Sequence, residues 1–245
     1  MRRPIIAGNW KMYKKDYEAF DFVKNLKPLV SEINDRTIVI CPSFVNLAKV
    51  YSEICDSNIA LGAQDLYWED EGAFTGEVSA PMLSAVGCTY TIIGHSERRQ
   101  FFGETNQTVN KKILSALKYK VFAIVCVGES LEEREKGITF QIIENQIKEG
   151  FTGLAKNDWE YMVIAYEPVW AIGTGKTATT QQAQEVHAFI RGLLPAEVAQ
   201  QVRILYGGSV KPENIKELMA QPDIDGGLVG GASLKVESFA KIIKY

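Results

Sequence analysis

The chain has 245 residues, with 27 Lys and Arg against 30 Asp and Glu, and its formal net charge is −3. Hydrophobic residues make up 46% and charged residues 23%, which is typical of a folded globular protein and argues against a disordered chain. The weak negative charge gives no electrostatic reason to expect nucleic acid or an anionic membrane as a partner.

The cysteines and the N-terminus point to an ordinary cytoplasmic protein. The N-terminal apolar stretch is too short for a signal peptide, and no stretch approaches the ~18 apolar residues of a membrane span. The cysteines are far apart and form no CxxC pair, so the sequence predicts neither a zinc site nor a disulfide framework. Because all four lie in or near apolar runs, we expect free thiols that pack as small hydrophobes: Cys41, Cys55, Cys88 and Cys126.

Short apolar runs rich in Ile, Val and Ala recur along the whole chain and predict eight β-strands. They are continuously apolar rather than alternating, as in parallel strands that are buried on both faces. In chain order the runs are Pro4–Asn9, Thr37–Pro42, Ala60–Asp65, Tyr90–His95, Phe122–Gly128, Met162–Pro168, Arg203–Gly208 and Gly226–Gly231.

Between several of these runs, apolar residues repeat at steps of three and four, which predicts helices over residues 19–30, 109–117 and 183–193. Thr179 and Gln182 are placed to form a capping box before the last of these helices. Strands that alternate with helices fit either a doubly wound sheet or a (β/α)8 barrel. Eight strands at intervals of ~31 residues favour the barrel, and no linker interrupts the series. We therefore expect one domain over residues 1–245.

In such a barrel, chemistry belongs where the strands end, at the carboxyl face. Taken alone, a strand-end histidine is as compatible with a structural role as with a functional one, and a strand-end glutamate is usually solvated. Together on one face, however, a cation, an imidazole, a carboxylate and two glycine turns make an active site. The residues at the strand ends on this face are Asn9, Lys11, His95, Ser96, Glu97, Glu167, Gly207–Ser209 and Gly230–Gly231. His187 lies within a helical pattern, which favours a surface or packing role for this residue.

The glycines after the sixth strand resemble two nucleotide-binding motifs, and neither interpretation holds. A P-loop would require glycine where Trp170 stands, and the relaxed dinucleotide fingerprint from Gly173 does not directly follow a strand. The pattern favours a lid over Pro168–Ala178, anchored at Pro168 and Trp170.

Three other glycine-containing segments predict contacts. The turns Gly207–Ser209 and Gly230–Gly231 could be ordinary turns, but after strands seven and eight they match the usual phosphate site of a barrel. The segment Gly72–Gly76 carries Phe74 in an otherwise acidic loop, and an exposed phenylalanine there indicates an oligomer contact.

Six longer motifs follow one another along the chain: Ala7–Met12, Gly72–Glu77, Ile93–Arg99, Ala165–Lys176, Tyr206–Val210 and Gly226–Leu234. With these motifs in this order, the sequence resembles the triosephosphate isomerase family along its whole length. One departure stands at the end of the third strand, where this chain has Asp65 and the family is expected to show asparagine.

The resemblance implies interconversion of dihydroxyacetone phosphate and D-glyceraldehyde 3-phosphate without cofactor or metal. Glu167 would move a proton between neighbouring substrate carbons, and His95 would act as the electrophile. Lys11 would stabilise the enediolate oxygen, with Asn9 beside it. Ser96 and Glu97 would support this set from the start of a short helix.

The resemblance also implies how the substrate phosphate is held and how the chain assembles. The phosphate would lie on backbone groups of Gly173, Ser209, Gly230 and Gly231, and closure of the lid would expel water. The chain would form a homodimer through Gly72–Gly76, with Thr75 reaching the neighbour's site.

Two alternatives belong to other classes. A catalytically silent phosphosugar-binding barrel could keep the glycine turns but would not need Lys11, His95 and Glu167 together. A Schiff-base aldolase would need a desolvated lysine inside the barrel, and Met162–Pro168 contains none.

Overall fold

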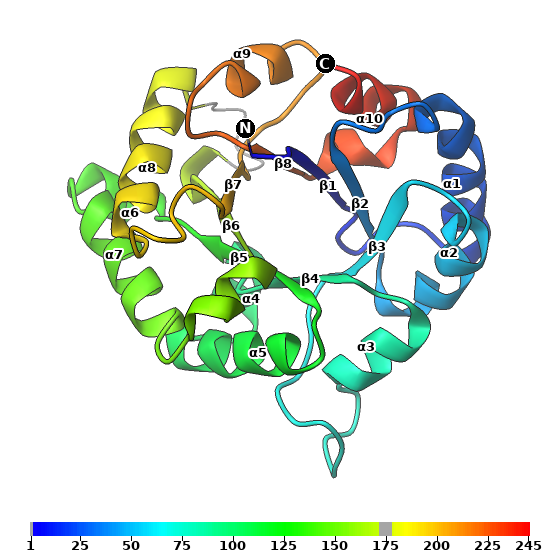
Figure 1. Ribbon diagram of the computed structural model, residues 1–245, viewed down its shortest axis with the longest axis horizontal. Helices are drawn as coiled ribbons and strands as arrows, with labels where there is room; N and C mark the ends of the chain where they lie inside the picture. Colours follow the sequence, from blue (N-terminus) through cyan, green and yellow to red (C-terminus); the bar gives the residue numbers. More distant parts are fainter. Residues whose placement is uncertain (1, 172–177) are drawn as a thin grey trace.

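The computed structural model describes residues 2–171 and 178–245 (Figure 1). Eight parallel strands close into a barrel in chain order, with β8 paired to β1, so the expected (β/α)8 TIM barrel is confirmed. The strands are β1 (Ile5–Asn9), β2 (Thr37–Cys41), β3 (Ile59–Ala63), β4 (Tyr90–Ile93), β5 (Phe122–Val127), β6 (Met162–Tyr166), β7 (Arg203–Tyr206) and β8 (Gly226–Val229).

Helices surround the barrel on the outside (Figure 1). The α-helices are α1 (Asp16–Val30), α2 (Leu47–Ile54), α3 (Ala80–Val86), α4 (Ser96–Phe101), α5 (Asn106–Lys118), α6 (Leu131–Glu135), α7 (Thr139–Gly150), α8 (Thr180–Leu193), α9 (Ile215–Met219) and α10 (Val236–Ile243). Short 3₁₀ helices are η1 (Phe44–Asn46), η2 (Lys156–Tyr161), η3 (Val169–Ala171) and η4 (Gly231–Leu234).

The strands are apolar throughout because each faces two separate cores. In β5, Ile124 and Cys126 point into the barrel interior, whereas Ala123, Val125 and Val127 belong to the core beneath the helices. Both sets are almost completely buried. This two-sided burial explains why no alternation of polar and apolar residues is visible in the sequence.

The three predicted helices are present. The stripe Ala19, Val23, Leu26 and Val30 is buried in α1, and the Thr179 hydroxyl accepts from the Gln182 amide as the capping box predicts. The expectation for the cysteines is wrong at one position. Cys55 is exposed, because it follows the last apolar residue of α2 and caps the helix end, whereas the other three thiols are buried.

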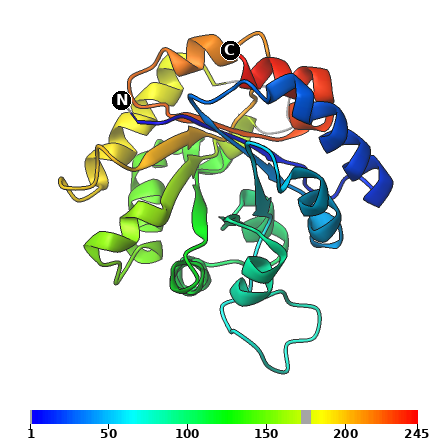
Figure 2. The ribbon, with the colours of Figure 1, turned by 45° about the vertical axis from the view of Figure 1, so that its right-hand side comes forward.

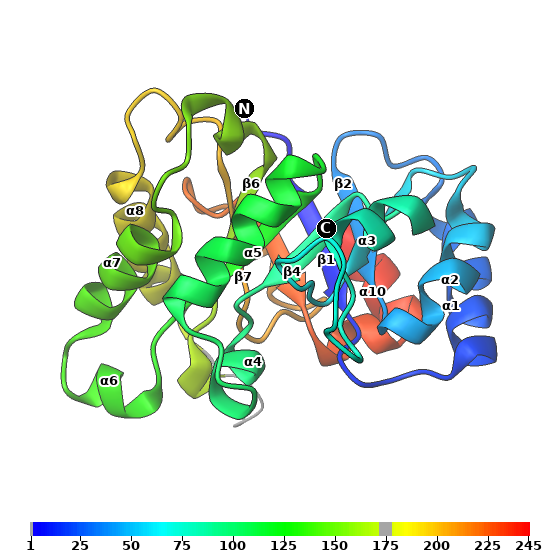
Figure 3. The ribbon, with the colours of Figure 1, turned by 90° about the horizontal axis from the view of Figure 1, so that it is seen from below.

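The segment between β3 and α3 projects away from the barrel as a long loop (Figure 2). Residues 71–77 are all exposed, and the Phe74 ring lies 4.7 Å from that of Tyr67. Figure 3 shows α4 and α6 at the end of the molecule opposite the N-terminus, which is the end where the strands terminate. In residues 2–171 and 178–245, no helix is long and apolar enough to cross a membrane.

A buried charge cluster fixes the position of α4. With six residues, α4 is too short to be stable by itself, so it depends on tertiary anchors. One anchor is Arg98, whose Nε lies 2.8 Å from Asp65 Oδ2 and 2.9 Å from Glu104 Oε1. Lys112 Nζ lies 2.6 Å from Asp65 Oδ1 and also contacts Glu104, so two cations face two carboxylates.

This cluster predicts an acid-dependent difference between the protein and Asp65→Asn. Burial, with the neighbouring Glu104 carboxylate adding to it, raises the pKa of Asp65 to about 6, above the ~3.9 of an unfolded chain. At pH values between these two pKa values, Asp65 is protonated in the folded state and ionised in the unfolded state. The free energy of unfolding of the wild type, relative to Asp65→Asn, should rise by about 1–2 kcal/mol from pH 7 to pH 5.

Urea titrations at a series of pH values measure this difference. Asp70→Asn is the matched control, because the exposed Lys118 lowers the pKa of Asp70. The free energy of unfolding of the wild type, relative to Asp70→Asn, should fall rather than rise, and only as the pH falls towards 4. A wild-type advantage over Asp65→Asn that stays constant from pH 7 to pH 5 would contradict the titration of Asp65.

Candidate active site

A cavity of about 350 Å³ lies at the carboxyl ends of the strands and brings together most of the predicted site. It contains the ends of β1, β4, β6, β7 and β8, as expected for the functional face of a barrel. Ser96 and Glu97 lie behind its wall, at the start of α4. The predicted residues in its lining are Asn9, Lys11, His95, Glu167, Ser209, Gly230 and Gly231.

The hydrogen bonds of His95 define which ring nitrogen carries a proton. His95 is the N-cap of α4, and its Nδ1 accepts from the backbone N–H of Glu97 at 3.2 Å. An accepting Nδ1 has a free lone pair, so the hydrogen of the neutral ring is on Nε2. Nε2 lies 3.1 Å from Glu167 Oε1, facing the carboxylate as a donor. A neutral imidazole with N–H at Nε2 can polarise a substrate oxygen.

Glu167 directly follows β6 and is 2% exposed. Its backbone amide donates to the Val127 carbonyl at 2.8 Å, which continues the strand pairing past Tyr166. Ser96 holds both carboxylate oxygens, with its backbone amide 2.9 Å from Oε2 and its hydroxyl 3.1 Å from Oε1. Oε1 therefore contacts both Ser96 and His95, while Glu167 lines the cavity.

Lys11 is held by a strained turn after β1. Its φ is 53°, in the left-handed region, and its backbone amide donates to Asn9 Oδ1 at 3.0 Å. The Gln64 side chain donates to the Lys11 carbonyl at 2.8 Å. The ammonium then lies 2.7 Å from Glu97 Oε1, and a Cβ on Gly230 would be only 4.0 Å from Nζ. The cation is thus placed between α4 and the glycine turn.

The glycine turn at the end of β8 leaves room for a ligand. Gly230 is the N-cap of η4, and the Ser233 side chain donates to its carbonyl at 2.7 Å. A Cβ added at Gly231 would have no described neighbour within 4 Å, so this part of the wall is open. With Lys11 and Lys211 in the same lining, the turn suits an anionic group such as a phosphate.

One buried cluster at this face was missed by the sequence reasoning. Glu129 is fully buried and accepts hydrogen bonds from Tyr166 Oη at 3.1 Å and Trp170 Nε1 at 2.8 Å. Arg134 NH1 lies 3.1 Å from the same carboxylate. Glu129 follows β5 by two residues, so the strand-end rule could have found it. The cluster fixes the described start of the predicted lid.

Glu129→Gln is expected to lower the free energy of unfolding by about 1–3 kcal/mol. An amide accepts more weakly than a carboxylate, so the three donors, of which Tyr166 is buried, lose part of their partner. Chemical denaturation measures the effect. Glu132→Gln, at an exposed position in α6, should change stability little. Equal stability of Glu129→Gln and the wild type would show that this cluster does not hold the segment.

The remaining predicted residues lie elsewhere. Thr75 is exposed on the projecting loop and lies outside its own chain's cavity. Gly173 and the central part of the Pro168–Ala178 lid fall at 172–177, outside the described residues. His187 is buried in α8 between Tyr166 and Tyr206, and burial lowers its pKa to about 3, so it has a packing position.

Comparison with known proteins agrees with this geometry. The family model described as triosephosphate isomerase matches residues 4–245. A triosephosphate isomerase of Moorella thermoacetica is 59% identical, and one of Geobacter metallireducens is 58% identical; each alignment covers 100% of this chain and 99% of the relative. One of Thermoanaerobacter pseudethanolicus is 56% identical, with both chains fully covered. The chain therefore belongs to the triosephosphate isomerase family.

Proposed function

We propose that this protein is a triose-phosphate isomerase that interconverts dihydroxyacetone phosphate and D-glyceraldehyde 3-phosphate, a reaction of glycolysis and gluconeogenesis. The observation that carries the proposal is the pairing of a buried carboxylate with a neutral imidazole at 3.1 Å. An ammonium and an open glycine turn line the same cavity. These are the groups that a proton transfer next to a carbonyl requires in a phosphorylated substrate.

The reaction moves one proton between neighbouring carbons. Glu167 takes the proton from the first carbon, and the electron pair of that C–H bond forms the carbon–carbon double bond of an enediolate. The Nε2 hydrogen of His95 and the ammonium of Lys11 stabilise the negative oxygen, with the Asn9 amide beside it. A hydroxyl proton passes between the two oxygens of the enediolate, Glu167 returns its proton to the second carbon, and the aldose has become the ketose. None of these steps requires a metal or a cofactor.

The phosphate of the substrate would be held by backbone groups of Gly173, Ser209, Gly230 and Gly231. Three of these four residues line the described cavity. Closure of a lid over residues 168–178 would exclude water, strengthen these hydrogen bonds and protect the enediolate from losing phosphate. The Glu129 contacts with Trp170 would hold the first part of that lid.

We further propose a single domain over residues 1–245, a cytoplasmic location and a homodimer. The homodimer is supported by large apolar side chains left exposed on the chain, including Met12 at 95%, Val45 at 86% and Phe102 at 67%. Where exposed apolar side chains gather into one large patch, the patch marks a protein interface. In the dimer, Thr75 would reach the partner subunit's Lys11 and the partner subunit's His95.

Thr75→Arg is expected to convert the dimer to a monomer. The added charge would be buried without a partner in the interface, but it remains solvated in the free chain, where Thr75 is exposed. Sedimentation should show the mass of two chains for the wild type and of one chain for the variant. Thr152→Arg, at an exposed threonine after α7, should stay dimeric. A wild type that sediments as a monomer with full activity would contradict the homodimer.

Isomerase turnover tests the proposed reaction. Glyceraldehyde 3-phosphate is supplied with a chelator, and the dihydroxyacetone phosphate formed is reduced by an NADH-dependent enzyme. We expect sustained oxidation of NADH. Measurable phosphosugar binding without turnover would instead favour the silent phosphosugar-binding barrel, which the joint presence of Lys11, His95 and Glu167 argues against.

A further inference from the structure

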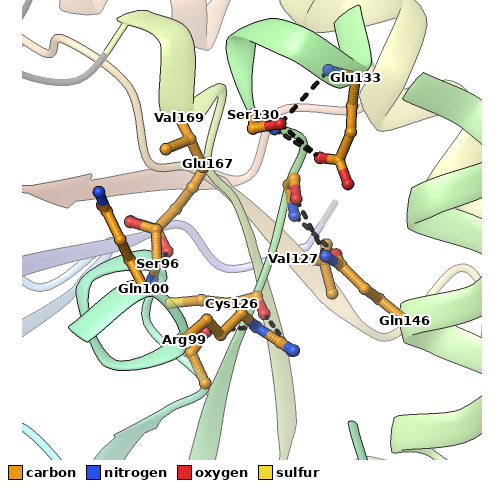
Figure 4. A pocket seen from close by; sticks show the side chains of 12 residues that line it. Ser96, Arg99, Gln100, Cys126, Val127, Ser130, Glu133, Gln146, Glu167 and Val169 are labelled. Carbon is orange, nitrogen blue, oxygen red and sulfur yellow. Dashed lines mark hydrogen bonds between the residues drawn. The ribbon is translucent and has the colours of Figure 1, made fainter. Parts of the chain in front are cut away.

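A second cavity of about 410 Å³ lies on the other side of Glu167, between α4, the end of β5 and the start of α6 (Figure 4). We call it the rear cavity. Its lining includes Ser96, Arg99, Val127, Glu133 and Val169. Among the described residues, Glu167 alone lines both the rear cavity and the substrate cavity. Its volume falls within the ~300–1,000 Å³ typical of small-molecule sites.

Most polar groups in the wall of the rear cavity already have partners within the protein. The Gln146 amide accepts from the Gly128 N–H at 2.8 Å and donates to the Gly128 carbonyl at 3.0 Å. Ser130 donates to Glu133 Oε2 through its backbone amide at 2.8 Å and its hydroxyl at 2.9 Å (Figure 4). A ligand therefore finds few donors and meets the apolar surface of Val127 and Val169.

The guanidinium of Arg99 is likewise occupied. It donates to the Gly94 carbonyl at 2.9 Å and to Asn106 Oδ1 at 2.8 Å, and a longer contact of 3.4 Å reaches the Cys126 carbonyl. Burial is the main cause that lowers the pKa of Arg99. The same lining carries two carboxylates, those of Glu133 and Glu167, and the Glu167 carboxylate interacts electrostatically with Arg99.

This balance of charge restricts the ligand. A second anion, such as a triose phosphate, would be repelled by the two carboxylates and would find Arg99 already hydrogen-bonded. An ammonium would lose its hydration beside Arg99. Both Glu167 oxygens already accept from Ser96, and Ser130 bonds only to Oε2 of Glu133. Apart from the exposed Gln100 amide, the polar group that remains for a ligand is Glu133 Oε1, which accepts only. A neutral ring with one N–H donor satisfies these conditions.

We propose that the rear cavity binds a small neutral heteroaromatic molecule with one N–H donor, and that the bound molecule keeps Glu167 on Ser96. With both oxygens kept on Ser96, the carboxylate could not move towards the substrate carbon, so occupation of the rear cavity would stop proton transfer while the phosphate turns stay accessible. The inhibitory effect rests on the proposed isomerase activity. Binding itself does not, so the two are measured separately.

Indole is the probe, and 1-methylindole, which lacks the N–H donor, is the matched control. Isothermal titration should give a dissociation constant for indole of about 1 mM or below, a realistic affinity for so small a ligand. 1-Methylindole should bind at least ~5-fold more weakly, because it cannot donate to Glu133 Oε1 and covers this half-buried oxygen without a hydrogen bond. Equal affinity of the two would overturn the assigned chemistry.

Two variants locate the binding. Gln100 lines the mouth of the rear cavity and is exposed, so Gln100→Trp should fill the mouth and weaken indole binding at least ~10-fold. Gln107→Trp, at an exposed position of α5, should bind as the wild type does. If Gln100→Trp fails to fold, Glu133→Gln serves instead. Glutamine keeps the capping box. In this variant the difference in affinity between indole and 1-methylindole should become smaller. Indole binding that neither variant changes would place the ligand elsewhere.

Kinetics then test the consequence. Indole should lower kcat of the wild type without raising KM, and Gln100→Trp should be resistant. Competition with the substrate would show that indole occupies the substrate cavity and would overturn the proposal. Indole binding that depends on Gln100, in a protein without isomerase turnover, would keep the site and refute only the proposed function.

Discussion

Glu167→Gln is expected to lower kcat by at least ~10²-fold, because it removes the general base and keeps its shape. Glutamine can still accept hydrogen bonds from Ser96 through its carbonyl oxygen, so the local structure should persist. It cannot take a proton from carbon at neutral pH. KM should change far less than kcat, since the phosphate turns at Ser209 and Gly230 are untouched. Steady-state kinetics in the coupled assay measure both constants.

The control for this variant is Glu135→Gln, which makes the same chemical change at an exposed position in α6. It should show wild-type kinetics. If Glu167→Gln kept more than a tenth of the wild-type kcat, another group would have to be the base, and the proposed mechanism would fail at its first step.

Lys11→Met is expected to lower kcat/KM by about 10²–10³-fold. Removal of one preorganised group that stabilises a developing oxyanion typically costs this much. The effect should appear in both kcat and KM, because the ammonium faces a negative intermediate and also attracts a doubly charged substrate. The linear methionine side chain can follow the path of the lysine chain, so the turn should be kept.

Lys15→Met tests whether loss of any nearby positive charge has the same effect. Lys15 is exposed and precedes α1, and its backbone amide, which bonds to Glu18, is unchanged by the substitution. This variant should lose less than ~2-fold in kcat/KM, from weaker electrostatic attraction alone. Similar losses in both lysine variants would indicate that Lys11 acts only through long-range charge.

The barrel could be predicted because its strands are buried on both faces and its repeat has the length of one β-plus-α unit. The functional face followed from one rule, that parallel strands end together. Thus the sequence places His95 and Glu167, 72 positions apart, on one face, and in the structure they lie 3.1 Å apart. The direction of each side chain, and which ring nitrogen of His95 carries the hydrogen, depend on contacts that the sequence does not show.

Other features depend on contacts that no local pattern records. Glu129 is an ordinary strand-end carboxylate in the sequence, and only packing shows that Tyr166, Trp170 and Arg134 converge on it. The charge cluster of Asp65 joins segments from β3 to α5. The rear cavity has no motif of its own, since it is formed where four segments of the chain meet around Glu167.

Hydrogen exchange during turnover tests the central claim most directly. The reaction is run in D2O, and carbon-bound deuterium is measured in the product by NMR. If Glu167 carries the proton, its carboxyl O–H can exchange with solvent during the enediolate stage, so the account predicts deuterium on the carbon that is reprotonated, and none for Glu167→Gln over the same time. Complete conversion with no carbon-bound deuterium would indicate direct hydride transfer between the carbons and would contradict the account.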